Sequence, residues 1–398
     1  MKILHTPVRF FPYIGGVEAY VHDLSTQLVD RGHEVTVVCA DVQEETDNHE
    51  WIDGIEVKRL RSIGQIANTN ITPSLPGVLL KEARAADVIH THLPTPWFAD
   101  WSALAGAITD TPVVVTYHND IIGEDLADYV ARIYNQSMLK ATLGLSDSVV
   151  VTQPEYVSNS AHLDDQMEKI DMIPNGVDTE HYTPVDLSDA ERERLGLDPD
   201  RPTLFFLSVL DGHHEYKGLT DLLDAMAHLD DGEGRTPQLL VGGGGDAQSR
   251  YEAYADEAGV ASSVTFLGRV PEEDITSYYS GADLFVLPST SSDQEGFGLV
   301  LLEALACGTP VVTTDVVGIA DEVRSEPIGT VTPIADPEAL ASSIEAQLDG
   351  DEFEPAVARA LCEDEYSWQA SAVEMEKLYR RVVTDPAVPS PSGAVNRS

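Results

Sequence analysis

Two glutamates, Glu295 and Glu303, stand in the part of this chain whose residue types are best suited to chemistry. The first lies in a loop rich in Ser, Asp and Gly, and the second lies within an apolar helix predicted over 299–307. A carboxylate among Leu, Val and Ala is costly unless hydrogen bonds satisfy it. The vicinal diols of a ribose or hexose can donate such bonds. The segment therefore predicts a sugar-nucleotide site.

Lysine use points to a second residue of interest. Between Lys169 and Lys377 the only lysine is Lys217, in a chain that carries 24 Lys and Arg against 68 Asp and Glu. Because the chain uses lysine so rarely, this exception calls for a functional explanation. The alternative is a solvated lysine at the start of a helix.

The composition describes an acidic globular protein. Its net charge is −44, and its hydrophobic content of 42% is ordinary for a folded chain. This combination suggests a halophilic source of the haloarchaeal type, where molar salt screens self-repulsion. Without a basic stripe, duplex nucleic acid is excluded as a partner and docking on anionic membranes is disfavoured.

No targeting or metal-binding pattern stands out. The three cysteines, Cys39, Cys307 and Cys362, lie in apolar contexts and form no C-x-x-C pair, which indicates buried free thiols. No apolar run reaches the roughly 18 residues of a membrane span, and the first residues lack a signal-peptide core. We expect a cytoplasmic protein whose membrane contact, at the inner face, is at most peripheral.

Short β-branched runs alternate with helical patterns, which is typical of βαβ units with parallel sheets. A polar segment rich in turn residues, 179–202, separates two such series and predicts a hinge. We expect two Rossmann-like domains, over 1–178 and 203–370, that face a central ligand-binding cleft. A closing helix over 371–383 precedes a Pro- and Ser-rich tail, 384–398, predicted to be disordered.

Seven short motifs, taken in order, resemble family 4 (group 1) of the retaining glycosyltransferases with the GT-B fold. The most specific is the Glu-x7-Glu element at 295–303. The others are Gly15-Gly16-Val-Glu18, Asp87-Val-Ile-His-Thr-His92, Thr116-Tyr-His118-Asn-Asp120, Ile173-Pro-Asn-Gly-Val-Asp178, Lys217-Gly218 and Val264-Thr-Phe-Leu-Gly-Arg269. The resemblance implies transfer of a hexose from a UDP- or GDP-sugar to a hydroxyl acceptor, such as a glycolipid, a lipid-linked sugar or a surface-glycan intermediate.

The resemblance implies a donor-binding role for most motifs of the second half. Glu303 would hold the ribose hydroxyls, and Glu295, also a catalytic candidate, would hold hydroxyls of the transferred sugar. The first N–H groups of the following helix would face the diphosphate. The other donor-binding residues that it implies are Arg269, Val270, Gly296, Phe297, Gly298, Leu299 and Val300. The alternative is an ordinary loop-to-helix junction.

The same resemblance implies two further catalytic candidates, Lys217 and His118. Lys217 would place a positive charge on the leaving diphosphate. His118, which follows an apolar strand, would contact the donor sugar, and the backbone at Gly16 would approach the diphosphate. A lone histidine is often structural, so that alternative stays open for His118. His90 and His92 could be acceptor contacts or satisfied core histidines.

The chain departs from the family pattern just before Lys217. The common form has an arginine there in a Gly-Arg-Leu element, whereas this chain has Ser208-Val-Leu and a longer loop. His213, His214 or the more distant Arg269 could supply the missing charge, and the sequence assigns none of them.

No metal is expected at the site. The Asp-x-Asp spacings at 198–200 and 349–351 lack the strand-end context of a metal site, and the glycine run 242–245 does not match a nucleotide-binding P-loop. Charge on the diphosphate would then be met by Lys217 and helix N-termini. Two other functions remain open: a sugar-nucleotide 2-epimerase, and a non-catalytic sugar-nucleotide-binding relative, which the missing arginine favours.

Overall fold

In a computed structural model the chain forms two compact units, each described here by itself. The first unit comprises Met1–Asn175 with Trp368–Ser398, and the second comprises Gly176–Ser367. The structure describes residues 1–13, 15–41, 48–66, 69–118, 133–153, 157, 160, 162–229, 236–292, 294–295 and 297–384. The predictions for Gly296 and for the tail after Thr384 lie outside these residues.

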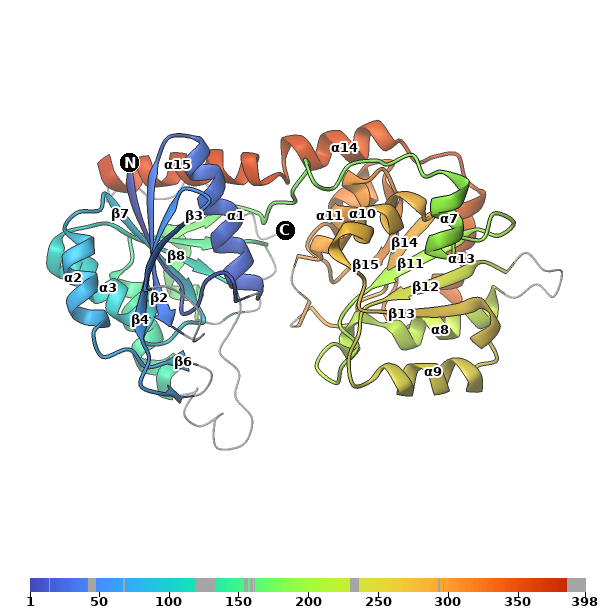
Figure 1. The fold of residues 1–398 in the computed structure, drawn as a ribbon, viewed down its shortest axis with the longest axis horizontal. Helices are drawn as coiled ribbons and strands as arrows, with labels where there is room; N and C mark the ends of the chain where they lie inside the picture. The colour runs from blue at the N-terminus through green and yellow to red at the C-terminus, as the bar shows by residue number, and fades with distance from the viewer. Residues whose placement is uncertain are drawn as a thin grey trace. The chain divides into compact units, whose positions relative to one another are not determined.

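The first unit is built on an eight-stranded sheet in the order β10-β9-β8-β7-β1-β2-β4-β3 (Figure 1). Among these strands, β3 alone pairs antiparallel, with β4. Its strands are β1 (Lys2–Thr6), β2 (Glu34–Asp41), β3 (His49–Ile52), β4 (Ile55–Arg61), β7 (Val88–Leu93), β8 (Val113–Tyr117), β9 (Ser148–Val151) and β10 (Ile170–Met172). A separate two-stranded hairpin joins β5 (Gln65–Ile66) to β6 (Thr69–Asn70).

Helices cover both faces of this sheet. Successive residues of a strand point to opposite sides, so the apolar side chains of one strand pack against helices on both faces. On β8, Val113 and Val115 pack into one apolar cluster and Val114 into another. The helical segments are α1 (Gly16–Asp30), α2 (Leu75–Ala83), α3 (Phe98–Thr109), η1 (Asn135–Leu139), α5 (Lys140–Leu145), η2 (Asp164–Lys169) and α15 (Trp368–Thr384). Residues of α2, α3 and α5 belong to the first cluster, and residues of α1 and α15 belong to the second.

The second unit has a six-stranded, all-parallel sheet in the order β13-β12-β11-β14-β15-β16. Its strands are β11 (Thr203–Leu207), β12 (Gln238–Gly242), β13 (Val264–Gly268), β14 (Leu284–Leu287), β15 (Val311–Thr314) and β16 (Gly329–Thr332). The first strand of the unit, β11, lies between β12 and β14, so the strand order reverses there. In such sheets, ligands bind at the carboxyl ends of the strands that flank this reversal.

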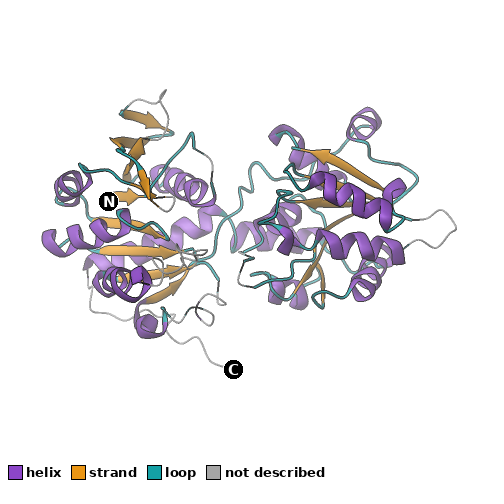
Figure 2. Cartoon of the chain, turned by 90° about the horizontal axis from the view of Figure 1, so that it is seen from below, coloured by secondary structure: helices purple, strands orange, loops and turns teal. Residues whose placement is uncertain are grey.

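Helices lie on both sides of this sheet as well (Figure 2). They are α7 (Asp189–Leu195), η3 (Glu215–Lys217), α8 (Leu219–His228), α9 (Gln248–Glu257), η4 (Ala261–Ser263), α10 (Glu272–Gly281), α11 (Leu299–Ala306), α12 (Ala320–Ser325), α13 (Pro337–Asp349) and α14 (Pro355–Asp364). The two doubly wound α/β units confirm the predicted fold class. Along the described residues, no helix combines the length and the apolar character needed to cross a membrane.

The three cysteines are buried free thiols, as their apolar contexts predicted. Burial raises the pKa of each thiol, Cys39, Cys307 and Cys362, to about 12. They therefore stay protonated at neutral pH and behave as small apolar side chains.

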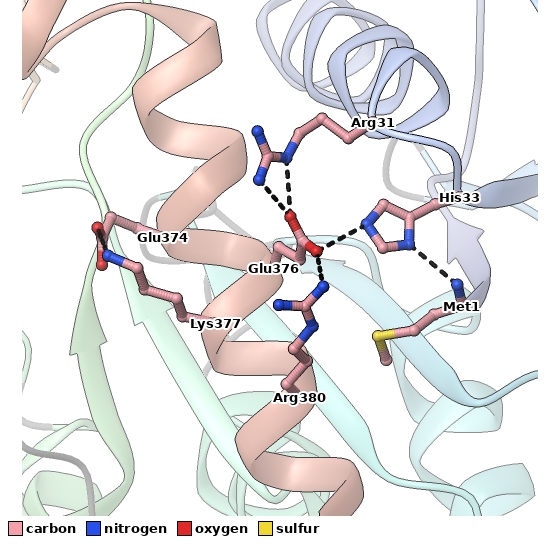
Figure 3. A network of polar contacts seen from close by, with 7 residues as sticks. All are labelled: Met1, Arg31, His33, Glu374, Glu376, Lys377 and Arg380. Atoms are coloured by element: carbon pink, nitrogen blue, oxygen red, sulfur yellow. Dashed lines mark hydrogen bonds and ion pairs between the residues drawn. The ribbon is translucent and has the colours of Figure 1, made fainter.

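The helix expected over 371–383 is α15, which packs beside α1 of the first unit although it follows the second unit in sequence. A buried carboxylate, Glu376, fastens it (Figure 3). Arg31 at the end of α1 donates to this carboxylate at 2.8 Å, and Arg380, one turn along α15, donates to its other oxygen. The Glu376 side chain is 7% exposed, so these cations offset its desolvation.

We predict that Glu376→Gln lowers the stability of the first unit by about 2 kcal/mol, because it leaves two arginines without their buried carboxylate. All four tryptophans, Trp51, Trp97, Trp101 and Trp368, lie in this unit. Urea unfolding followed by tryptophan fluorescence therefore measures its stability alone.

Glu374→Gln is the matched control, since Glu374 pairs with Lys377 on the exposed side of the same helix and should change stability by less than about 0.5 kcal/mol. Hydrogen bonding from Arg31 holds the pKa of Glu376 below its ordinary 4.5. The difference between wild type and Glu376→Gln should thus persist above pH 4.5 and shrink as the pH falls through the lowered pKa. Equal stabilities at pH 7 would contradict the prediction.

Candidate functional site

Two candidate residues meet at the strand-order reversal of the second unit. Lys217 follows β11 and Glu295 follows β14, 78 positions apart in sequence. The Lys217 Nζ donates to Glu295 Oε1 at 2.7 Å and to Oε2 at 3.0 Å. The Glu295 side chain is 1% exposed and that of Lys217 is 16% exposed. The chain therefore keeps a cation and a buried carboxylate at the point where parallel sheets bind ligands.

Hydrogen bonds between the two loops hold this ion pair. The hydroxyl of Ser289, two residues after β14, donates to Oε2 of Glu295. The Thr290 N–H donates to the carbonyl of Tyr216 at 2.7 Å, next to Lys217. The buried carboxylate thus has a cation and a hydroxyl as partners, which a buried charge requires.

The glycine after Lys217 is a steric requirement of the same contact. Gly218 has φ of +76°, and a Cβ on it would lie 2.0 Å from the carbonyl oxygen of Pro288. Only glycine adopts this backbone without strain, and only glycine lets the two loops lie this close. The Lys-Gly pair therefore couples the cation to the loop that leads to Glu295.

The glycine run 242–245 has a packing role. A Cβ on Gly243 would lie 1.7 Å from the carbonyl oxygen of Ser208, and one on Gly245 would lie 1.9 Å from that of Leu210. The Leu210 N–H in turn donates to the carbonyl of Gly244 at 3.1 Å. The run thus lets the loop after β12 pack backbone to backbone on the start of the loop that carries Lys217.

Helix α11 begins beside the ion pair. Its N-cap, Gly298, has φ of +75°, no described side chain caps this end of the helix, and its first turn holds no acidic residue. Phe297 is buried and packs on the Tyr366 ring with centroids 5.4 Å apart. The first helical residues, Leu299 and Val300, are half-buried. Their N–H groups and the helix dipole give this end a positive potential that suits an anion.

Glu303 lies one turn further along α11 and is half-buried. The Tyr279 hydroxyl donates to its Oε2 at 2.7 Å, and the Tyr182 hydroxyl bonds to it as well. Burial raises the pKa of Glu303, and the two tyrosine bonds oppose that rise. Sequence reasoning missed both tyrosines, since neither stands near Glu303 in the chain.

Two other candidate cations of this unit, Arg269 and His214, have different surroundings. Arg269, at the end of β13, is exposed, and Val270 beside it packs against Gly242. In the loop that replaces the family's arginine, His214 Nδ1 lies 2.7 Å from Asp211 Oδ1. The charge that His214 would carry is thus offset within its own loop.

In the first unit, His118 directly follows β8 and is half-buried. Its Nε2 lies 3.3 Å from His92 Nδ1, and the Tyr20 ring stands edge-on to it at 4.9 Å. Burial lowers the pKa of His118 to about 4, so the ring is neutral at pH 7. At Gly16, the first residue of α1, an added Cβ would meet no described atom within 4 Å. Neither strain nor internal packing explains the glycine at this position.

His90 and His92 are fully buried, which favours core histidines over acceptor contacts, the two alternatives that the sequence left open. His90 bonds through its two nitrogens to the hydroxyls of Tyr379, at 2.6 Å, and Thr116, at 2.7 Å. With His5 they also form a group whose nitrogens lie within 4.8 Å of one another, close enough for one metal ion. However, both His90 nitrogens already have hydroxyl partners, so a metal would have to displace one of them.

Comparisons with known proteins match both halves of the chain. Residues 14–181 match the model for Glycosyltransferase Family 4, and residues 188–361 match the model for glycosyl transferases group 1. A D-inositol 3-phosphate glycosyltransferase of Xylanimonas cellulosilytica is 29% identical over 92% of this chain and 91% of its own. A phosphatidyl-myo-inositol mannosyltransferase of Mycolicibacterium smegmatis is 27% identical over 97% of this chain and 95% of its own.

Solved structures support the same fold. A sucrose-phosphate synthase from Thermosynechococcus elongatus superposes with a TM-score of 0.71 at 27% identity, covering 96% of this chain and 98% of its own. The structure of the Anabaena protein HepE in complex with UDP and glucose superposes with a TM-score of 0.70 at 20% identity, covering 96% of this chain and 99% of its own. At this identity the likeness bears on the fold alone. The two α/β units are thus those of the GT-B fold. These relatives are bacterial and lend no support to a haloarchaeal source.

We predict that Gly218→Ala destabilises the second unit by at least about 2 kcal/mol, because a Cβ there meets the Pro288 carbonyl in a left-handed backbone. Gly212→Ala, in the same loop, is the control, since its Cβ would meet no described atom within 4 Å. Scanning calorimetry should show a lower transition for the first variant and an unchanged or slightly higher one for the second. Equal transitions would show that the two loops separate at no cost.

Proposed function

The chain belongs to the glycosyltransferases whose halves match family 4 and group 1, and from this premise we propose that it is a retaining hexosyltransferase. In this proposal a nucleoside diphosphate sugar is the donor and a hydroxyl group is the acceptor. The observation that carries the proposal is the Lys217–Glu295 ion pair at the strand-order reversal, beside the uncapped start of α11.

The diphosphate is assigned to Lys217 and the start of α11. When the bond between the anomeric carbon and the diphosphate oxygen breaks, negative charge develops on that oxygen. The Lys217 ammonium and the first N–H groups of α11, at Leu299 and Val300, would stabilise it in the way that preorganised donors lower such barriers. The chemistry proposed for these groups requires no metal.

Retention of configuration is carried over from the family resemblance, and the contacts of Glu295 bear on the route by which it would occur. Glu295 bonds to Lys217 and Ser289, so it is engaged in binding and is a poor nucleophile. We therefore infer a front-face displacement with an oxocarbenium-like transition state. The acceptor oxygen bonds to the anomeric carbon on the face that the diphosphate leaves, and the departing diphosphate oxygen takes the acceptor proton.

Glu303 is assigned to the ribose. An ionised carboxylate can accept hydrogen bonds from both hydroxyls of a vicinal diol. The bonds from Tyr279 and Tyr182 fix the direction in which the carboxylate points and favour its charged form. Because no base contact is identified, UDP and GDP are both retained as donors.

His118 and Gly16 complete the assignment from the first unit. His118 is neutral at pH 7, and its ring nitrogen that does not face His92 can form a hydrogen bond with a sugar hydroxyl. The open space over Gly16 suits a close approach of the diphosphate to the backbone.

In the second unit, Arg269 and Val270, at the end of β13, are assigned to the nucleoside.

The acceptor proposal draws on the names of relatives. One is a D-inositol 3-phosphate glycosyltransferase and another a phosphatidyl-myo-inositol mannosyltransferase. We infer a polyol acceptor of the inositol type, free, phosphorylated or carried on a lipid. A net charge of −44 disfavours recruitment by anionic lipid, so a lipid-borne acceptor would be bound through its polyol head and apolar contacts.

One observation favours a second candidate, a sugar-nucleotide-binding protein without transferase activity. The family's arginine is replaced by a loop in which Asp211 offsets His214, so Lys217 lacks the usual second cation. An epimerase acting on the same donor is the third candidate.

We predict that one UDP- or GDP-hexose releases free nucleoside diphosphate in molar KCl when an inositol acceptor is added. Lys217→Met should lower kcat by about 10²–10³-fold, as the loss of one transition-state donor does. Glu303→Ala should weaken binding of the nucleoside diphosphate about 10- to 100-fold, because the ribose hydroxyls lose their charged hydrogen bonds. Lys140→Met is the control, because Lys140 is an exposed lysine of the first unit.

The double variant Lys217→Met/Glu295→Gln separates catalysis from folding, because it removes the buried charge that Lys217→Met alone leaves unpaired. A double variant that is folded but much less active than Glu295→Gln alone supports a catalytic Lys217. An isomeric nucleotide sugar without free diphosphate would indicate the epimerase, and binding without turnover would indicate the non-catalytic protein.

A pH titration tests Glu303 separately. Because burial raises the pKa of Glu303 above its ordinary 4.5, the protonated form appears at a higher pH than for an exposed glutamate. We predict that affinity for the nucleoside diphosphate falls as the pH decreases towards that range, since the protonated carboxyl accepts fewer ribose bonds. Calorimetric titration of Glu303→Gln should show weaker binding and a flatter pH dependence. A wild-type affinity as flat as that of the variant would remove Glu303 from the ribose site.

A further inference from the structure

Three histidines of the first unit form a row that leads to His118. His5 Nδ1 lies 3.4 Å from His92 Nε2, and His92 Nδ1 lies 3.3 Å from His118 Nε2. Both contacts are long for hydrogen bonds, and the ring planes are nearly parallel, 14° and 25° apart. Strand register explains the row: His5 stands opposite His90 on β7, and His92 opposite Thr116 on β8, all on the face covered by α1 and α15.

The inner end of the row has a polar atom without a partner. His5 is 0% exposed, and its Nε2 makes no hydrogen bond to any residue that the structure describes. A buried N–H without an acceptor is costlier and rarer than an acceptor with an unused lone pair. His5 therefore carries its proton on Nδ1, where His92 Nε2 can accept it.

The same logic then runs outward along the row. A neutral imidazole has one N–H and one acceptor nitrogen, so His92, which accepts at Nε2, carries its proton on Nδ1 and donates to His118 Nε2. His118 in turn accepts at Nε2 and carries its proton on Nδ1. Desolvation by burial keeps the rings neutral, since it lowers the pKa of His5 to about 3 and that of His118 to about 4.

We propose that His5 and His92 are positioning residues that lock His118 in the tautomer with its proton on Nδ1, so that His118 presents an N–H donor to the donor sugar. The inference deepens the proposed function and rests on it for the identity of the ligand. Locking the tautomer in advance avoids a proton rearrangement when a sugar oxygen arrives, which is the advantage of a preorganised donor.

His90 lies beside the row but outside it. Its two nitrogens bond to the hydroxyls of Tyr379 and Thr116. His90 therefore does not influence which nitrogen of His118 carries the proton. A metal held by His5, His90 and His92 is the competing explanation for the unpartnered His5 nitrogen. Such a metal would have to displace one of the two hydroxyl bonds of His90, so we favour the row.

The tautomer of His118 can be measured in the full-length protein. Long-range ¹H–¹⁵N correlation spectra of protein labelled at histidine distinguish a proton on Nδ1 from one on Nε2, with His118→Gln assigning the signal. We expect His118 with its proton on Nδ1 in wild type. A proton on Nε2 would overturn the proposal, and so would one equivalent of bound zinc in the purified protein. This measurement needs no turnover, so it stands even if the proposed function fails.

Substitutions at His5 then test the coupling. His5→Leu removes the donor at the inner end, so the His118 tautomer should become mixed and kcat should fall about 10-fold. His5→Asn keeps an N–H donor near the position of Nδ1, so it should restore both the wild-type tautomer of His118 and the wild-type kcat. His90→Gln is the control for damage to the same buried layer and should leave the tautomer of His118 unchanged. A His5→Leu variant that keeps the wild-type tautomer, or a loss of activity equal in His5→Leu and His5→Asn, would refute the positioning role.

Discussion

The second unit depends on one constraint, the closure of the β11 loop onto the β14 loop at the strand-order reversal. A positive φ at Gly218 and the absence of a Cβ there let the backbone contact the Pro288 carbonyl. That contact sets Lys217 against Glu295, and the cation in turn makes it possible to bury the carboxylate. The glycine run 242–245 supports the same loop from the other side, again by close backbone packing. The ion pair at the site therefore depends on three glycines, Gly218, Gly243 and Gly245, at each of which a Cβ would clash with the backbone of another segment.

The two units place polar groups within apolar cores by the same rule. Candidate residues in each unit have a neighbour that satisfies them: Glu295 has Lys217, Glu303 has Tyr279, and His92 has two histidines. Such networks hold a group in one orientation at the cost of desolvation. His5 Nε2 is the exception at the end of its row. Because this nitrogen has no partner among the described residues, the proton of His5 is placed on Nδ1, and this fixes which ring donates in each contact of the row. A network in which every nitrogen had a partner would not fix it.

An acidic chain that binds an anionic donor has to confine its positive charge. With 24 basic residues against 68 acidic ones, the surface as a whole repels a diphosphate. Lys217 is mostly buried, and the start of α11 carries no acidic side chain in its first turn. Positive potential is thus supplied locally by one cation and one helix terminus, where screening by salt is weakest.

The sequence by itself determined the kind and order of the elements, because period-2 and helical patterns are local properties of the chain. It also singled out Glu295, Glu303 and Lys217 as candidate residues, since a charge in an apolar segment and a rare residue type can be recognised from the sequence alone. The family resemblance added the fold, which the paired sheets confirm.

Tertiary structure decided what those residues touch. The pairing of Lys217 with Glu295 joins positions 78 apart, and the bond from Tyr279 to Glu303 joins positions 24 apart. Helix α15 follows the second unit in sequence but completes the first, because its apolar side fits the cluster beside α1 and Glu376 finds Arg31 there. The histidine row depends on the register of β1, β7 and β8. Such contacts arise from packing between distant segments, so no pattern within one segment could specify them.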